Sequence, residues 1–239
     1  MSRTEVEVHV DLDGTPHLAG VLHGASRNGR TSTRFFYAEE WLRLPGRFAI
    51  EPALSLGPGG HTPDGGREIF GAFSDSAPDT WGRELMRRLE RRTAQREGRG
   101  VRTLTEIDYL LGVSDTARLG ALRFRRRGEE AFQSPLAKGG IPPLVDLPRL
   151  LATTDRVLRN QETDDDLRLL FAPGSSLGGA RPKASVADRD GRLAIAKFPR
   201  ESDDYGIEAW ESIALRLAAK AGIRTSEQRV SRPSPGDRS

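Results

Sequence analysis

Strict alternation of apolar and polar side chains over residues 5–11 is the feature that most restricts the fold. Val6, Val8 and Val10 share one side, which is typical of a strand with one buried face. Asp13-Gly14 follows, and an Asp-Gly pair is a strong signal for a two-residue hairpin turn. Residues 17–23 then return as the partner strand. The N-terminus is therefore predicted to form an antiparallel hairpin.

Helical spacing replaces this alternation later in the chain. Residues 79–97 carry their apolar side chains on one face, with Asp79 placed to cap the helix. Residues 204–222 show the same spacing, which ends at Gly222. Trp41 and Trp81 are interpreted as core anchors. Strands and helices together predict an α+β fold.

A basic and then glycine- and proline-rich stretch, residues 126–146, divides the chain and is predicted to be a linker. Residues 1–125 are predicted to form a β-rich N-terminal subdomain with helices. Residues 147–230 are predicted to hold helices and a strand pair joined near Asp190-Gly191. The polar, proline-rich residues 231–239 are expected to be disordered.

The composition excludes several classes of site. The chain has no cysteine, which rules out disulfides and thiolate chemistry. Its four histidines lack the spacing of metal ligands, so we predict no metal site. The N-terminus lacks an apolar signal core, and no run approaches the roughly 20 apolar residues that span a bilayer. A cytoplasmic protein without membrane contact is expected.

Residues 87–102 are rich in arginine. Such a stretch can form a patch for nucleic acid or an acidic partner. It can also be a solvated helix end and loop. We favour the second interpretation.

A glycine-containing loop, a lysine and a glutamate follow one another in the second half of the chain. Small residues within the stretch 175–183 let a backbone approach a polyanion closely, and unpaired backbone N–H groups there can hold phosphate oxygens. Lys197 ends an apolar strand, and Glu211 on the next helix can hold it extended. This order is the protein-kinase arrangement. The alternatives are a plain turn and a lysine that extends into solvent.

Five stretches of the sequence resemble the HipA family of serine/threonine kinase toxins from bacterial type II toxin–antitoxin systems. They cover nearly the whole chain in the family's order. They are FGAFSDSAPDTWGRELMRR (70–88), LLGVSDTARLGALRF (110–124), SSLGGARPKASV (175–186), LAIAKFP (193–199) and EAWESIALRLAAKAGI (208–223). The resemblance implies that residues 147–230 are part of a kinase-like N-lobe.

The same resemblance implies a set of nucleotide-binding residues. They are Ser176, Gly178, Gly179, Ala180, Lys183, Lys197 and Glu211. It also implies that Ser176 can be autophosphorylated, which would repel nucleotide phosphates because a phosphate adds about two negative charges. The implied activity is ATP-dependent phosphorylation of a protein serine or threonine, with Mg²⁺ as the metal of the full-length family. Implied partners are a HipB-like helix-turn-helix antitoxin and a translation-class substrate such as an aminoacyl-tRNA synthetase, with DNA reached only through the antitoxin.

The sequence departs from the family after Lys197. No catalytic aspartate, magnesium-binding asparagine or second metal-binding aspartate follows in the expected context before residue 239. We therefore expect a chain truncated before the helical C-lobe, with no catalytic residues of its own and inactive alone. The alternative is a non-catalytic binding module that pairs with an antitoxin or a separately encoded kinase core.

Overall fold

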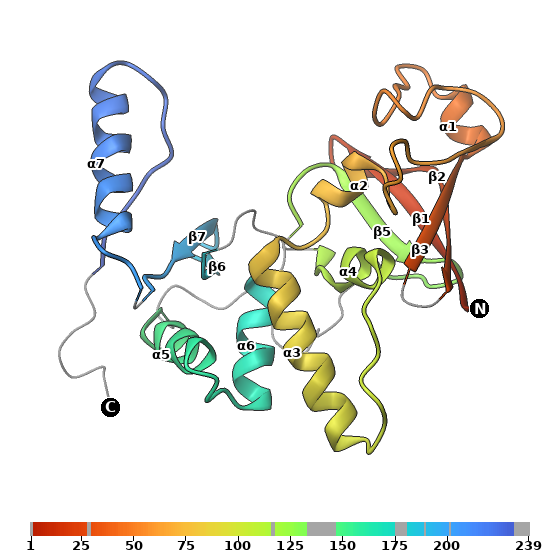
Figure 1. Ribbon diagram of the computed structural model, residues 1–239. Helices are drawn as coiled ribbons and strands as arrows, with labels where there is room; N and C mark the ends of the chain where they lie inside the picture. Colours follow the sequence, from red (N-terminus) through yellow and green to blue (C-terminus); the bar gives the residue numbers. More distant parts are fainter. Residues whose placement is uncertain are drawn as a thin grey trace.

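The computed structural model describes residues 2–27, 30–115, 118–132, 147–174, 181–188, 190–200 and 202–231. Most of the predicted linker and of the predicted disordered tail lies outside these residues. The fold is a mixture of helices and antiparallel sheet, as the sequence predicts (Figure 1). No helix in the described ranges is long and apolar enough to cross a membrane.

A five-stranded antiparallel sheet forms the N-terminal part, in the order β4-β3-β2-β1-β5. The strands are β1 (Ser2–Leu12), β2 (Thr15–Arg27), β3 (Arg30–Tyr37), β4 (Gly60–His61) and β5 (Leu122–Arg126). The predicted hairpin is confirmed, because Leu12 pairs with Thr15 across a two-residue turn. Asp13 and Gly14 both have positive φ, 51° and 83°, as this turn requires.

Helices contribute buried side chains to the same hydrophobic core as this sheet. They are α1 (Glu39–Arg43), α2 (Gly71–Asp75), α3 (Thr80–Arg96) and α4 (Glu106–Gly112). Val6, Val8 and Val10 are buried, as their alternation predicts. Trp41 and Trp81 are also buried, in agreement with their interpretation as core anchors.

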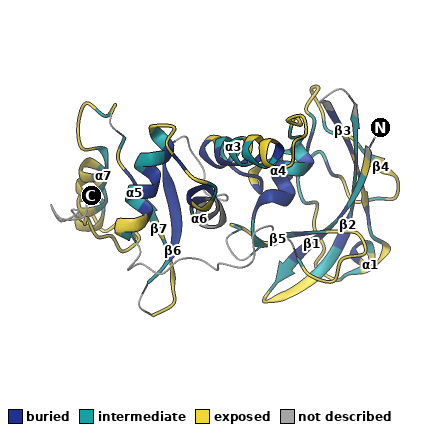
Figure 2. Ribbon diagram, turned by 90° about the horizontal axis from the view of Figure 1, so that it is seen from below, coloured by how far each residue is buried: buried dark blue, intermediate teal, exposed yellow. Residues whose placement is uncertain are grey.

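The remaining elements form a second group beside α3. They are α5 (Leu147–Leu158), α6 (Asp164–Gly174), β6 (Lys183–Ala187), β7 (Leu193–Lys197) and α7 (Ile207–Lys220). β6 and β7 pair antiparallel, and α6 lies beside α3 (Figures 1 and 2). Leu150, Leu167 and Val186 are buried in the same hydrophobic cluster as the N-terminal core.

Arginines of α3 join the two groups at the rim of this core. Arg88 donates to the Val157 carbonyl at 2.9 Å, and Arg96 donates to Asp164 at 3.3 Å. Arg92 also pairs with Asp164, at 3.6 Å. These arginines of the basic stretch therefore have partners within the chain.

Glu90 gives the arginine-rich segment a pH-dependent contribution to stability. Its buried carboxylate accepts hydrogen bonds from Arg99 at 2.6 Å and from the Arg102 N–H at 3.1 Å. The Arg99 hydrogen bond, against the opposing effect of burial, lowers the pKa of Glu90 from 4.5 to about 2. Because the folded-state pKa is depressed, this stabilisation is full above about pH 4.5 and is lost as the pH falls towards 2.

Glu90→Gln is expected to lower the free energy of unfolding by about 2 kcal/mol at pH 7, the scale of a hydrogen bond to a charged group. The difference from the natural chain should shrink as the pH falls through the window in which Glu90 protonates. Urea unfolding at several pH values measures both effects, with the exposed Glu39→Gln as control. A loss that is the same at low and neutral pH would show that the Glu90 charge is not responsible.

Candidate functional site

The end of β7 presents Lys197 at the surface. Leu193, Ile195 and Lys197 alternate with less exposed residues, so they share the outer side of the strand. Phe198, directly after Lys197, is buried, and its N–H donates to the Pro182 carbonyl at 3.0 Å. This anchor fixes the strand end, while the Lys197 side chain remains 45 % exposed.

Glu211 lies one turn into α7 and faces Lys197. Its Oε1 accepts a hydrogen bond from the Lys197 Nζ, and the two side chains form an ion pair. The structure thus brings together the lysine and the glutamate that the sequence singles out. The Glu211 side chain is 39 % exposed, so the pair is accessible to solvent.

Lys183 is placed differently from Lys197, although the two are register partners in the β6–β7 hairpin. Its side chain is buried, and its Nζ donates to the Asp79 Oδ2 at 3.0 Å. The other oxygen of Asp79 accepts from the Gly82 N–H at 2.8 Å, which caps α3 as predicted. One carboxylate therefore caps α3 and joins it to β6, a second role that a cap pattern alone does not reveal.

The predicted phosphate loop lies between α6 and β6. Its residues Ser176, Gly178, Gly179 and Ala180 fall outside the described part of the chain. The elements on either side are described: α6 ends at Gly174, and β6 begins at Lys183.

Arg181 is a functional candidate that the sequence interpretation did not single out. Its two terminal nitrogens donate to the two oxygens of Asp203, at 2.7 and 2.6 Å. One of them also donates to Glu208 of α7 at 2.8 Å. The Arg181 hydrogen bonds, followed by one from the Arg200 N–H, lower the pKa of Asp203 to about 2. An arginine directly after the glycine-containing loop and an acidic pair before α7 were the available signals.

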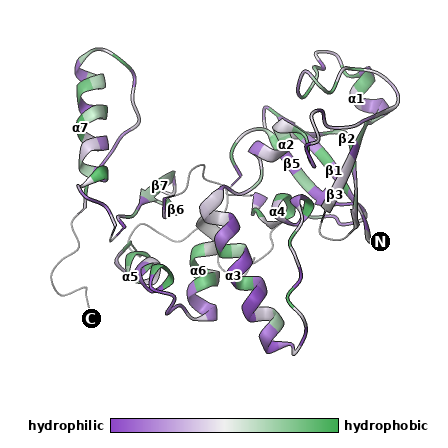
Figure 3. Ribbon diagram, in the orientation of Figure 1, coloured by the Kyte–Doolittle hydropathy of each residue, from purple (hydrophilic) through white to green (hydrophobic). Residues whose placement is uncertain are grey.

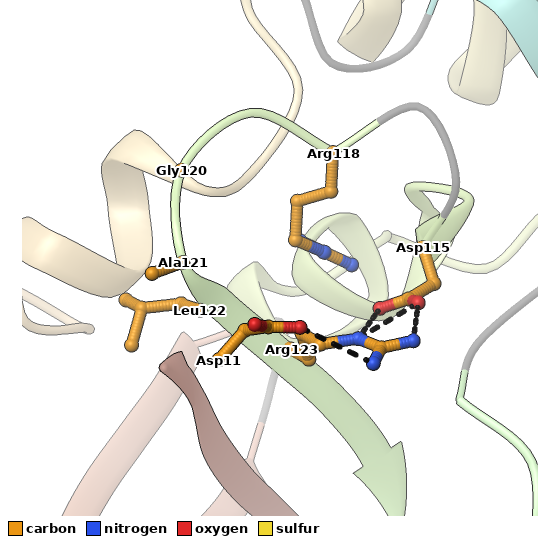
Figure 4. A pocket seen from close by; sticks show the side chains of 7 residues that line it. All are labelled: Asp11, Asp115, Arg118, Gly120, Ala121, Leu122 and Arg123. Atoms are coloured by element: carbon orange, nitrogen blue, oxygen red, sulfur yellow. Dashed lines mark hydrogen bonds and ion pairs between the residues drawn. The ribbon is translucent and has the colours of Figure 1, made fainter. Parts of the chain in front are cut away.

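A concave region lies beside β5, away from Lys197 and Glu211, and has a volume of about 550 Å³ (Figure 4). Its charged groups contact one another or the backbone. Arg123 pairs with Asp115 at 3.0 Å and with Asp11 at 3.6 Å. Arg118 donates to three carbonyls, those of Ser76, Leu110 and Val113. These contacts hold the Arg118 and Arg123 side chains in place, so their charges have a structural explanation.

Comparisons with known proteins do not assign a family. No protein-family model matches the chain, and no curated protein matches it.

Proposed function

We propose that this chain is a HipA-type serine/threonine protein kinase unit that binds ATP through a kinase-like N-lobe. The observation that carries the proposal is the ion pair between Lys197, at the end of β7, and Glu211, on α7. In protein kinases a strand lysine contacts the nucleotide phosphates, and a glutamate on the following helix holds that lysine in place. The same residue types stand here in the same order.

The residues present fit a nucleotide phosphate. Lys197 carries a fixed positive charge at a partly exposed strand end, and Glu211 restricts where that charge can lie. Because phosphoryl transfer depends mainly on positioning and electrostatic stabilisation, a restrained ammonium is the chemistry required. Bound ATP would supply the phosphoryl group for a protein serine or threonine. In this proposal Ser176 and the backbone of Gly178, Gly179 and Ala180 contact its phosphates.

Mg²⁺ and the partners are implied only by the resemblance to the HipA family. No group of three or more His, Asp or Glu side chains in the described ranges is arranged to hold a metal ion. A HipB-like antitoxin and a translation-class substrate such as an aminoacyl-tRNA synthetase remain proposed partners.

Lys197→Ala is expected to weaken ATP binding roughly tenfold to a hundredfold, because a hydrogen bond to a charged group contributes about 1.5–3 kcal/mol. Titration calorimetry of the purified chain with ATP measures the change. Lys220→Ala is the matched control, since Lys220 is an exposed lysine at the far end of α7. Equal affinities for the natural chain and Lys197→Ala would contradict the assignment of Lys197.

A second candidate function is a non-catalytic binding module, and the surface of α7 favours it. Trp210 and Leu217 are each 60 % exposed, and Ile213 is also exposed. Figure 2 shows α7 as largely exposed, and Figure 3 shows hydrophobic residues along it. Exposed apolar surface of this kind is typical of protein–protein contacts, here with an antitoxin or a separately encoded kinase core. The ATP titration separates the two candidates, because only the kinase unit requires ATP binding.

A further inference from the structure

The position of α7 depends on polar contacts. Every residue of this helix is described, and none of them is buried. Its Glu211 contacts Lys197, and its Glu208 contacts Arg181. Glu208 and Glu211 are three residues apart, a spacing that places both on one side of a helix. Two ion pairs therefore hold one side of α7, one to Lys197 at the end of β7 and one to Arg181, two residues before β6.

The Arg181 contact is the more rigid of the two. The two terminal nitrogens of its planar guanidinium each donate to one oxygen of Asp203. The nitrogen that contacts Asp203 Oδ2 also donates to Glu208. Asp203 is itself fixed, because its Oδ2 accepts from the Arg200 N–H at 2.8 Å and its own N–H donates to the Arg200 carbonyl at 3.1 Å. Because the guanidinium forms two parallel hydrogen bonds to a fixed carboxylate, the pair restricts the direction of the Arg181 side chain as well as its distance from Asp203. Lys197 offers a single ammonium, which lacks this directional constraint.

We propose that Arg181 is a positioning residue that holds the first turn of α7 where Glu211 can engage Lys197. The inference rests on the proposed function, since it assigns Arg181 a part in forming the nucleotide site. Arg181 acts through Glu211 and need not touch ATP. Without it, α7 would spend less time in the engaged position, and the apparent ATP affinity would fall in proportion.

Distance measurements can test this directly, because the chain has no native cysteine. Spin labels at Leu193→Cys on β7 and Ala219→Cys on α7 occupy exposed positions. Pulsed electron resonance is expected to give a narrow distribution of the distance between the two labels in the doubly labelled chain. The distribution should become clearly broader when Arg181→Ala is added. Arg181→Lys should fall between the two, since it keeps the charge and loses the fork. Arg192→Ala, which removes an ion-paired arginine at the turn end of the same hairpin, should leave the distribution narrow.

ATP titration of the unlabelled chain supplies the functional readout. If the engaged population falls to about a tenth, Arg181→Ala weakens binding about tenfold. Adding Arg181→Ala to Lys197→Ala should cause little further loss, because both act through the same contact. An unchanged distance distribution, or full additivity of the two variants, would overturn the role of Arg181. Failure of the natural chain to bind ATP would overturn the proposed function instead, while the distance measurement would still decide how α7 is held.

Discussion

Asp79→Ala is expected to lower the free energy of unfolding by about 3–5 kcal/mol, the scale for breaking a buried ion pair by removing one partner. The Asp79 and Lys183 side chains are only 8 % and 6 % exposed, and their contact joins α3 to β6. The substitution takes the carboxylate away from a buried ammonium. It also removes the cap of α3, which adds about 1 kcal/mol to the loss.

Urea unfolding followed by circular dichroism measures this loss, and two matched variants separate its parts. Asp79→Asn keeps a side chain that caps helices well and removes only the charge. It should therefore lose most of the free energy of unfolding that the ion pair with Lys183 contributes. Asp75→Ala removes an exposed aspartate from the nearby α2 and should change stability little. If Asp79→Asn were as stable as the natural chain, the Lys183 contact would contribute nothing to stability.

Phe73→Ala is expected to destabilise the chain by about 3–5 kcal/mol, the usual range for truncating a buried phenylalanine. Phe73 belongs to α2 and is completely buried. Its ring meets Phe35, Phe70 and Phe124 edge-on, with centroids 5.4, 5.5 and 5.9 Å away. Since Phe35 and Phe124 come from β3 and β5, the truncation leaves a cavity where α2 packs on the sheet.

Thermal and urea unfolding measure the effect of this truncation. Phe73→Leu should lose considerably less, because it retains most of the buried volume. Phe48→Ala is the control for removing a phenylalanine ring in general, since Phe48 is 45 % exposed. Equal losses for Phe73→Ala and Phe48→Ala would show that the aromatic contacts around Phe73 are not the source of the stability.

Local signals predicted much of the fold. Alternation and Asp13-Gly14 were sufficient for the β1–β2 hairpin, because both features act between neighbouring residues. The periodicity of residues 79–97 predicted α3, observed from Thr80 to Arg96. β5 was missed, since its five residues are too few to show a period and it is recruited by pairing with β1. Pairing between distant segments depends on tertiary contacts, which local patterns do not encode.

The candidate site, like the fold, could be predicted only where local sequence patterns determine it. The order of strand lysine and helix glutamate singled out Lys197 and Glu211, which the structure places in contact. The partners of Arg181 and Lys183 could not be predicted, because they depend on where a loop and α3 lie in space. The spacing in α7 likewise indicated an apolar face, but periodicity alone does not say which surface covers such a face.

The lack of buried residues in α7 has a consequence for how the chain folds. A helix of 14 residues is marginal in water when isolated, because its first turn is costly to form. Its order must then come from tertiary contacts, here with Arg181 and Lys197. The helix–coil equilibrium of α7 is consequently linked to the integrity of the β6–β7 hairpin. Local unfolding of that hairpin would therefore release the helix as well, so α7 cannot be more stable than the hairpin to which it is held.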